Sequence, residues 1–262
     1  MVLLKKEEEI RNLFRSKKGE LTTKQLITII VLIASFVIIL FLFFRLNLGE
    51  TNNKEICHNS VLLQEKGSLF GGPLDCRTDY LCVSAGGECE SITETSTADV
   101  SVGEGLKEEV MSVLAEEMAD CWWMFGEGEV NYGESDVVGR NTEYAICSIV
   151  SFDDNIQGNV PGISYSDFYD YLRTTSKSGS QTYLQYIYGT NVIEGIDEEE
   201  MVDFSFSESI DTSRRYSIIT GIDNRAGTKE SINPDLILKV YMIPTSETSE
   251  RLSTPRKFIT KA

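Results

Sequence analysis

Residues 26–44 read LITIIVLIASFVIILFLFF and contain no charged residue. As a helix, with a rise of about 1.5 Å per residue, this stretch would span roughly 28 Å, close to the hydrocarbon thickness of a bilayer. A helix satisfies every backbone polar group internally, as a single segment in lipid requires. The stretch therefore predicts one transmembrane helix at residues 26–44, with the lipid bilayer as its partner.

A cleaved secretory signal is the alternative interpretation of an apolar stretch near an N-terminus. Such a signal has an apolar core of about 7–15 residues, followed by a small-residue cleavage site. The core here is longer, and the residues after it, RLNLGE at 45–50, contain no such site. We therefore expect a retained signal-anchor.

The charges on the two sides of this stretch predict its orientation. Of the 24 basic and 41 acidic residues in the chain, eight basic and four acidic residues lie at or before Arg45, which leaves a net charge of about −21 after it. Because cytoplasmic flanks of membrane helices are enriched in Lys and Arg, we expect a cytoplasmic N-terminus and residues 46–262 outside the cell membrane. The acidic excess also argues against nucleic acid as a partner, since it cannot neutralise phosphates.

All the cysteines follow the apolar stretch, as expected in a compartment that permits disulfides. They are Cys57, Cys76, Cys82, Cys89, Cys121 and Cys147. We expect Cys121 to pair with Cys147, because Cys121 lies on the apolar side of a predicted helix and Cys147 in the middle of the next predicted strand. The other four would then pair in one of three ways. Free thiols are one alternative, and zinc is a weaker one because the chain has no C-x-x-C pair.

Shifts in composition divide the chain into segments. In order, we expect a cytoplasmic head (1–25), the transmembrane helix (26–44), a linker (45–56), a cysteine-rich module (57–92), a second linker (93–103), an extracytoplasmic domain (104–243) and a polar tail (244–262). Hydrophobic periodicity predicts an α+β fold for the domain, with amphipathic helices packed on an antiparallel sheet.

The clearest predicted helix covers residues 104–125, where apolar residues recur every three or four positions and acidic residues fill the other side. Ser164 and Ser180 are predicted N-caps of two shorter helices, the first ending at Tyr171 or Leu172 and the second at Gly189. Strands are predicted at residues 142–152, 202–206, 215–222 and 236–243.

Aromatic side chains gather in two places. Trp122 and Trp123 lie near the end of the 104–125 helix, and tyrosines crowd residues 165–188. We interpret both groups as packing at the core. A binding platform at the tryptophans and a sugar-binding surface at the tyrosines are the alternatives.

The N-terminal segment resembles a known processing signal. Lys17-Lys18-Gly19, directly before a polar turn and an apolar helix, resembles the processing site of type IV pilin-like proteins. The resemblance implies cleavage between Gly19 and Glu20, retention of the apolar helix and packing of such helices in a filament core. One departure is Lys24, which stands where the family commonly has a glutamate five residues into the mature helix.

A second resemblance covers most of the chain. The block LAEEMADCWWMFGEGE at 114–129 followed by AICS at 145–148, after an anchor and a cysteine-rich stretch, resembles a group of uncharacterised single-pass membrane-anchored archaeal proteins. The resemblance implies the same topology and an archaeal origin. It implies no activity.

Few residues select a particular chemistry. His58 is the single histidine, and we interpret it as a surface residue. Asp153-Asp154-Asn155 and residues 197–200 carry oxygen ligands that could hold calcium, but neither has the spacing of an EF-hand. We therefore expect no catalytic residue and no cofactor or metal site.

Two functional hypotheses follow from the sequence. The first is a structural or interaction protein of the cell envelope, whose partners are other envelope proteins or copies of itself. The second is an anchored carboxylate-based hydrolase that acts on envelope polymers. A deep cleft with two acids about 5–10 Å apart would favour the hydrolase. A shallow surface with paired cysteines would favour the first hypothesis.

Overall fold

The computed structural model describes residues 23–45, 52–65, 74–90, 92–132, 142–193, 208–223, 237–252 and 256–260. The chain divides into two units, Met1–Gly49 and Glu50–Ala262. The first unit contains the predicted membrane segment. The second contains the cysteines and the α+β domain.

Helix α2 (Thr23–Arg45) forms the described part of the first unit and includes the whole apolar stretch. Side-chain exposure is described for Gln25 and residues 27–38, and all of these side chains are exposed, with Leu32 63% and Phe36 60% accessible. Among the described residues, no helix is both long enough and apolar enough to count as a candidate membrane span. The helix is thus as expected, and its place in a membrane stays a prediction.

The second unit alternates short strands and helices. In order they are α3 (Asn52–Glu65), β1 (Asp79–Ser84), β2 (Ser96–Asp99), α4 (Leu106–Met124), β3 (Thr142–Phe152), α5 (Asp154–Asn159), β4 (Gly162–Ser164), α6 (Tyr165–Thr174), β5 (Ser176–Ser178), β6 (Gln181–Thr182), α7 (Tyr183–Tyr188), β7 (Ser209–Asp211), β8 (Tyr216–Asp223), β9 (Ile237–Pro244), η3 (Thr245–Glu247), α8 (Thr248–Arg251) and β10 (Arg256–Phe258).

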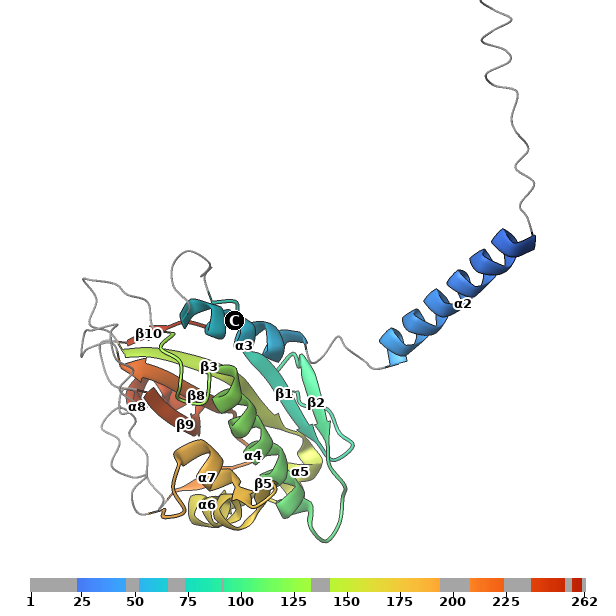
Figure 1. Ribbon diagram of the computed structural model, residues 1–262. Helices are drawn as coiled ribbons and strands as arrows, with labels where there is room; N and C mark the ends of the chain where they lie inside the picture. The colour runs from blue at the N-terminus through green and yellow to red at the C-terminus, as the bar shows by residue number, and fades with distance from the viewer. Residues whose placement is uncertain are drawn as a thin grey trace, which may run out of the picture. The chain divides into compact units, whose positions relative to one another are not determined.

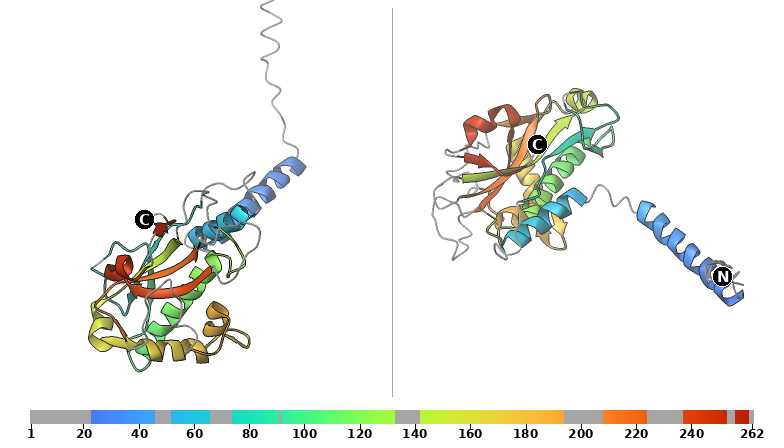
Figure 2. Two further views of the ribbon diagram at one scale, coloured as in Figure 1. Left: turned by 90° about the vertical axis from the view of Figure 1, so that its left-hand side faces the viewer. Right: turned by 90° about the horizontal axis from the view of Figure 1, so that it is seen from above.

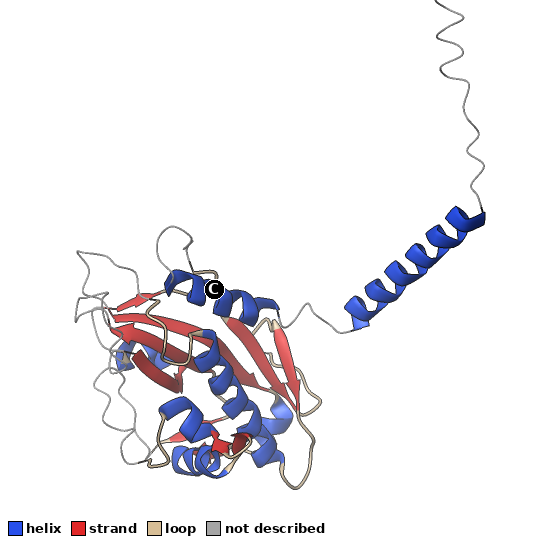
Figure 3. Cartoon of the chain, in the orientation of Figure 1, coloured by secondary structure: helices blue, strands red, loops and turns tan. Residues whose placement is uncertain are grey.

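The main sheet has the strand order β2-β1-β3-β8-β9 (Figures 1 and 3). Strands β3, β8 and β9 are antiparallel neighbours, as predicted. Strands β2 and β1 are parallel to each other, and β1 is parallel to β3. β10 also pairs with β3 in parallel. The α+β class is confirmed, but the sheet is mixed rather than wholly antiparallel.

Helix α4 packs against this sheet through the apolar side that its sequence predicts. Val110, Leu114 and Met118 are fully buried on it, and Trp122 is 4% exposed. Burying each such side chain contributes about 1.5–3 kcal/mol. The two views in Figure 2 agree that α3 lies beside α4 on the same face of the sheet. The helix ends at Met124, and Gly126 follows the C-cap residue Phe125 with a φ of 78°, which suits a residue without a Cβ.

The two predicted linkers and the cysteine-rich module need correction. Residues 52–56 of the first linker begin α3, and Ser96–Asp99 of the second linker form β2. Residues 57–92 are no separate module, because Cys57 and Leu81 belong to the same buried core as α4 and β1 lies inside the main sheet. The start of α3 and the strand β2 were missed because their residues are polar. β2 reads STAD, and it is a strand because it pairs with β1, not because its side chains favour one.

The predicted polar tail also contains ordered structure. Residues 245–251 form η3 and α8, Leu252 is 2% exposed, and β10 follows. Composition predicted only a polar tail here, because the hydrogen bonds and ion pairs with distant residues that hold η3 and α8 leave no local pattern.

The predicted helix caps are correct in one of two cases. Ser164 caps α6, since its hydroxyl accepts a hydrogen bond from the Asp167 backbone amide. Thr182, not Ser180, caps α7, because the Thr182 hydroxyl accepts a hydrogen bond from the Gln185 backbone amide. Gly189 ends α7 as expected. The predicted strand at 202–206 lies outside the described residues.

The tyrosines of α6 and α7 pack at the free edge of β9. The Tyr165 hydroxyl donates a hydrogen bond to the Met242 carbonyl at 2.9 Å, and the Tyr188 hydroxyl donates to the Val240 carbonyl at 2.5 Å. Burial raises the pKa of the Tyr165 phenol, which keeps it a donor. The core-packing interpretation of the tyrosines is therefore confirmed for these two residues, whose hydroxyls take the place of a further strand beside β9.

Candidate functional site

Three disulfides connect all the cysteines that the sequence singled out. Their pairs are Cys57–Cys76, Cys82–Cys89 and Cys121–Cys147, with Cα–Cα distances of 4.4, 5.8 and 5.6 Å. The expected pair, Cys121–Cys147, joins α4 to β3 and is confirmed. The other pairs are one of the three arrangements that the sequence left open.

Asp153, a candidate calcium ligand, instead holds the turn after β1. Its carboxylate is fully buried, and one oxygen accepts hydrogen bonds from the backbone amides of Ala85 at 2.8 Å and Gly87 at 2.7 Å. The other oxygen accepts from the Ile156 amide at 2.9 Å and so caps α5. These donors stabilise the carboxylate without a cation. The Cys82–Cys89 disulfide closes the same turn.

Asp153-Asp154-Asn155, which the sequence offered as an alternative calcium site, is therefore used within the fold. Asn155 donates its side-chain amide to the Ala85 carbonyl, and Asp154 is exposed. Throughout the part of the chain that the structure describes, no group of three or more His, Cys, Asp and Glu residues is arranged to hold a metal. Residues 197–200 lie outside it.

The contact between α3 and α4 combines an ion cluster with a ring stack. The Lys54 ammonium donates to Glu117 at 2.8 Å and to Asp120 at 2.7 Å. The His58 ring lies on the Trp123 ring at 4.1 Å between centroids, nearly parallel at 14°. We call these five residues the α3–α4 junction. The Cys57–Cys76 disulfide fastens the same helix to the chain before β1.

The structure modifies two interpretations at this junction. His58 is half-buried rather than a plain surface residue, and its Nδ1 lies 2.7 Å from the Trp123 carbonyl oxygen. Because a carbonyl oxygen only accepts, Nδ1 carries the proton. Trp122 is a core residue, as expected, whereas Trp123 is half-buried beneath the imidazole.

The junction carries a net negative charge, since one ammonium faces two carboxylates. Burial alone would lower the pKa of Lys54, but Glu117 and Asp120 outweigh burial and raise it. Burial raises the pKa of Glu117 although Lys54 opposes this. Burial therefore acts in opposite directions on the two pKa values, whereas the neighbouring carboxylates raise both.

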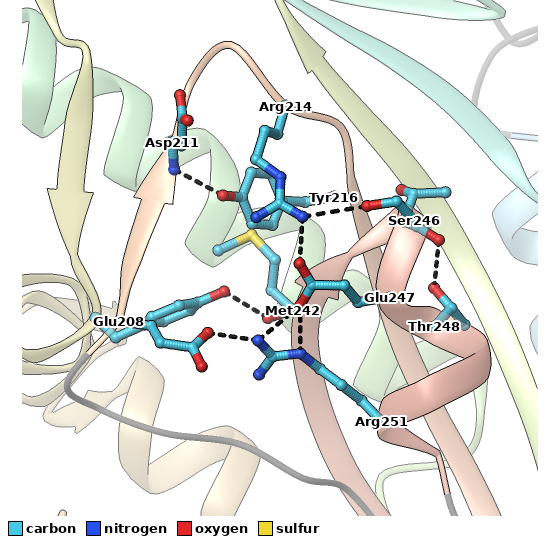
Figure 4. Close-up of polar contacts among 11 residues, drawn as sticks. Glu208, Asp211, Arg214, Tyr216, Met242, Ser246, Glu247, Thr248 and Arg251 are labelled. Carbon is cyan, nitrogen blue, oxygen red and sulfur yellow. Dashed lines mark hydrogen bonds and ion pairs between the residues drawn. The ribbon is translucent and has the colours of Figure 1, made fainter.

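A second ionic network fastens α8 to the segment before β8 (Figure 4). Glu247 accepts hydrogen bonds from both Arg214 and Arg251. Arg251 also donates to Glu208 at 2.6 Å, and Arg214 donates to the Ser246 hydroxyl at 3.1 Å. We call Glu208, Arg214, Glu247 and Arg251 the α8 clasp. Its two cations balance its two anions, and the bonds from Arg214 and Arg251 lower the pKa of Glu247.

Sequence reasoning missed both ionic clusters. The pair Glu247–Arg251 has the i,i+4 spacing of a helical ion pair, a signal that could have predicted part of the α8 clasp. The pairs Lys54–Glu117 and Arg214–Glu247 join residues far apart in the chain, and no local pattern reveals them.

A pocket of about 320 Å³ lies between the loop after β2 and the end of α5. Its walls include Leu106 and Val160, and its ionisable lining residues are Lys107 and Glu108. Lys107 forms an ion pair with Asp167 at 2.8 Å. Glu108 is the one carboxylate in this lining, so the pocket does not supply the pair of acids that the hydrolase hypothesis requires.

The predicted processing site, Gly19 and Glu20, lies outside the described residues. Comparisons with protein-family models, with curated proteins and with solved structures found no match for this chain.

Proposed function

We propose that the protein is a structural or interaction protein of the cell envelope, anchored once in the membrane and displaying an acidic α+β domain outside. The observation that carries the proposal is the uncharged stretch at residues 26–44, which lies within α2. The described apolar side chains of α2 are about half exposed or more, such as Val31 at 61% and Ile38 at 59%. In water, each of these side chains would lack the roughly 1.5–3 kcal/mol of stabilisation that burial of an apolar side chain supplies. Insertion of the helix into lipid would provide it.

The disulfides and charges support the proposed orientation. Disulfides persist in oxidising compartments, and all three lie after α2. The excess of Lys and Arg before α2, with a net charge of about −21 after Arg45, agrees with a cytoplasmic N-terminus. An acidic domain remains soluble at a membrane surface and favours partners with basic segments.

The proposal extends to pilin-like processing. Lys17-Lys18-Gly19 stands directly before the start of the proposed mature chain at Glu20. Removal of residues 1–19 would leave α2 close to the new N-terminus, as an anchor or as a helix that packs with copies of itself.

Membrane extraction and protease protection test the anchor. The full chain should stay with membranes after alkaline carbonate washing, and protease added outside intact cells should digest the domain. A variant with Leu32→Arg and Val37→Arg should be released, because each charge at a helix centre costs about 2.5–3.5 kcal/mol on insertion. Leu32→Ile with Val37→Ile is the matched control. Release of the unaltered chain by carbonate would contradict the proposal.

N-terminal sequencing of the extracted protein tests the processing. We expect the mature chain to begin at Glu20. An intact segment 1–19 would leave a simple anchor and remove the pilin-like part of the proposal.

A further inference from the structure

Two strands share one edge of β3. β1 pairs with the second half of β3, where Asp79 lies opposite Ser148, and β10 pairs with its beginning, where Arg256 lies opposite Thr142 and Phe258 opposite Tyr144. β10 comes from the end of the chain and is placed as an added strand (Figure 1). Such addition uses backbone hydrogen bonds for affinity, and side chains only adjust it.

The place that β10 occupies is well provided with hydrogen bonds. The Ile259 amide donates to the Tyr144 carbonyl at 3.0 Å, and the Ile146 amide donates to the Thr260 hydroxyl at 3.1 Å. The Phe258 ring contacts the Tyr144 ring at 6.4 Å between centroids, while Phe258 stays 43% exposed. We call the edge of β3 at residues 142–146 the β3 slot.

Helix α8 and Leu252 precede β10 in the chain and pack on the domain. The α8 clasp binds Arg251, whose side chain is 14% exposed, and Leu252 is buried. Residues 253–262 contain Arg256, Lys257 and Lys261 and no acidic residue. A basic extended segment therefore docks on a domain that is otherwise strongly acidic, so its charge complements any copy of the domain.

The other described edge of the antiparallel part of the sheet is closed to such addition. On β9 the Val240 and Met242 carbonyls already accept hydrogen bonds from Tyr188 and Tyr165. The β3 slot, in contrast, is satisfied by a short terminal strand that carries its own donors. Tyrosine hydroxyls thus occupy two acceptors of β9, whereas a strand from later in the chain occupies the edge of β3.

We propose that β10 exchanges between copies, so that the C-terminal segment of one copy fills the β3 slot of a second copy. Each copy has one donor strand and one acceptor slot, and exchange links copies through backbone pairing. A short connection gives docking within one chain an effective concentration of millimolar order, so exchange needs copies at comparable density. This step rests on the proposed function, because anchoring confines the copies to one surface.

Cysteine cross-linking tests the exchange in the full chain. Thr142 and Arg256 are register partners, and neighbouring strands lie about 4.8 Å apart, within the Cα range of a disulfide. The native cysteines are all paired, so cysteines introduced by Thr142→Cys and Arg256→Cys would be the reactive thiols. The Thr142 hydroxyl makes no hydrogen bond to a described residue, which makes its loss tolerable.

The experiment has a control within one chain and a test between chains. A chain with both substitutions should cross-link internally and report that β10 docks. Chains with Thr142→Cys, mixed with chains with Arg256→Cys in phosphatidylcholine vesicles, should form covalent dimers that increase with protein density. Adding Ile259→Pro to the Arg256→Cys chain removes the donor to Tyr144 and should abolish the dimers, whereas Ile259→Ala should keep them.

The background of random cross-linking between chains is measured with Ser180→Cys in place of Arg256→Cys. Ser180 is exposed and lies outside β10. Several-fold more dimer than this background supports exchange. Internal cross-linking without dimers above background overturns it, and so does a doubly substituted chain that fails to cross-link. Flotation of the vesicles reports anchoring separately, and repeating the mixture in concentrated detergent micelles tests exchange even if flotation fails.

Discussion

The α3–α4 junction and the α8 clasp fasten the first and the last helix of the same domain by different means. At the junction, one Lys faces two carboxylates, and a disulfide holds the helix as well. In the clasp, Arg214 and Arg251 balance Glu208 and Glu247, and no covalent bond adds to them. The junction therefore tolerates a charge imbalance that the clasp does not have. We therefore expect α8 to depend on its ion pairs more than α3 does, since α3 has a disulfide beside them.

Removing the disulfide at α3 should have the largest effect on this comparison. In the chain-entropy estimate, Cys57→Ser with Cys76→Ser loses about 3 kcal/mol, because the closed loop is about 20 residues long. Hydrogen exchange should accelerate throughout α3. The matched control, Cys82→Ser with Cys89→Ser, closes a shorter loop and should lose about 2.5 kcal/mol, with faster exchange in the turn after β1 and not in α3. If the hydrogen exchange of α3 did not change, the ion cluster of the junction would be sufficient to hold the helix without the disulfide.

Breaking the clasp at Arg251 should have the next largest effect. Arg251→Met keeps the apolar part of the side chain but leaves Glu208 and Glu247 without their shared cation, at a cost of about 1–2 kcal/mol. Urea unfolding measures this change. Arg173→Met is the control, since Arg173 pairs with Asp170 at an exposed helical position and should lose less than about 0.5 kcal/mol. Equal losses for the two variants would remove the special role of the clasp.

Acid should affect the two regions in opposite directions. The pKa of Glu247 is lowered, so its stabilisation is present above the ordinary Glu pKa and is lost as pH falls through the lowered value. The pKa of Glu117 is raised, so its charged form costs stability at neutral pH, and this cost disappears as pH falls. The stability difference between the unaltered chain and Glu247→Gln should therefore shrink between about pH 7 and about pH 3.5, while that for Glu117→Gln should grow. Slopes of the same sign would contradict this.

Salt should give the smallest effect. Raising sodium chloride from about 0.1 M to about 1 M shortens the Debye length from about 10 Å to about 3 Å and weakens exposed pairs by up to about 1 kcal/mol. Hydrogen exchange should accelerate in α8 and change less in α3, which its disulfide retains. Arg251→Met is the control, because most of its clasp is already lost and salt should add little. Equal acceleration in the two helices would show that α3 also depends on its ion pairs.

The sequence predicted those elements whose own residues determine them. The predicted helix at 104–125 differs from α4 by one or two residues at each end, and the predicted strand at 142–152 is β3. Both have strong periodicity or a continuous apolar run. The Cys121–Cys147 pair was predicted from the same two elements. Cys121 lies on the apolar side of the helix, and Cys147 lies in the middle of the strand.

The remaining elements depend on partners far along the chain. β2 and β10 are short and polar, and parallel pairing with β1 or β3 places them. With the exception of Glu247–Arg251, the ion pairs of the junction and the clasp join residues that are more than 30 positions apart in the chain. Local periodicity carries no information about such contacts, which explains why residues 93–103 were interpreted as a linker and residues 244–262 as a polar tail.

The turn held by Asp153 limits how this protein can diverge. A Cβ on Gly87 would lie 2.8 Å from an Asp153 oxygen, closer than side-chain atoms pack, so Gly87 admits no other residue while Asp153 stays. Core positions accept many apolar substitutions of similar volume, and their identities drift readily. A distant descendant of the same ancestor should therefore keep the Cys82–Cys89 spacing, a glycine two residues before the second cysteine and an aspartate at the end of the following long strand. These positions offer a better signature of ancestry than the hydrophobic core.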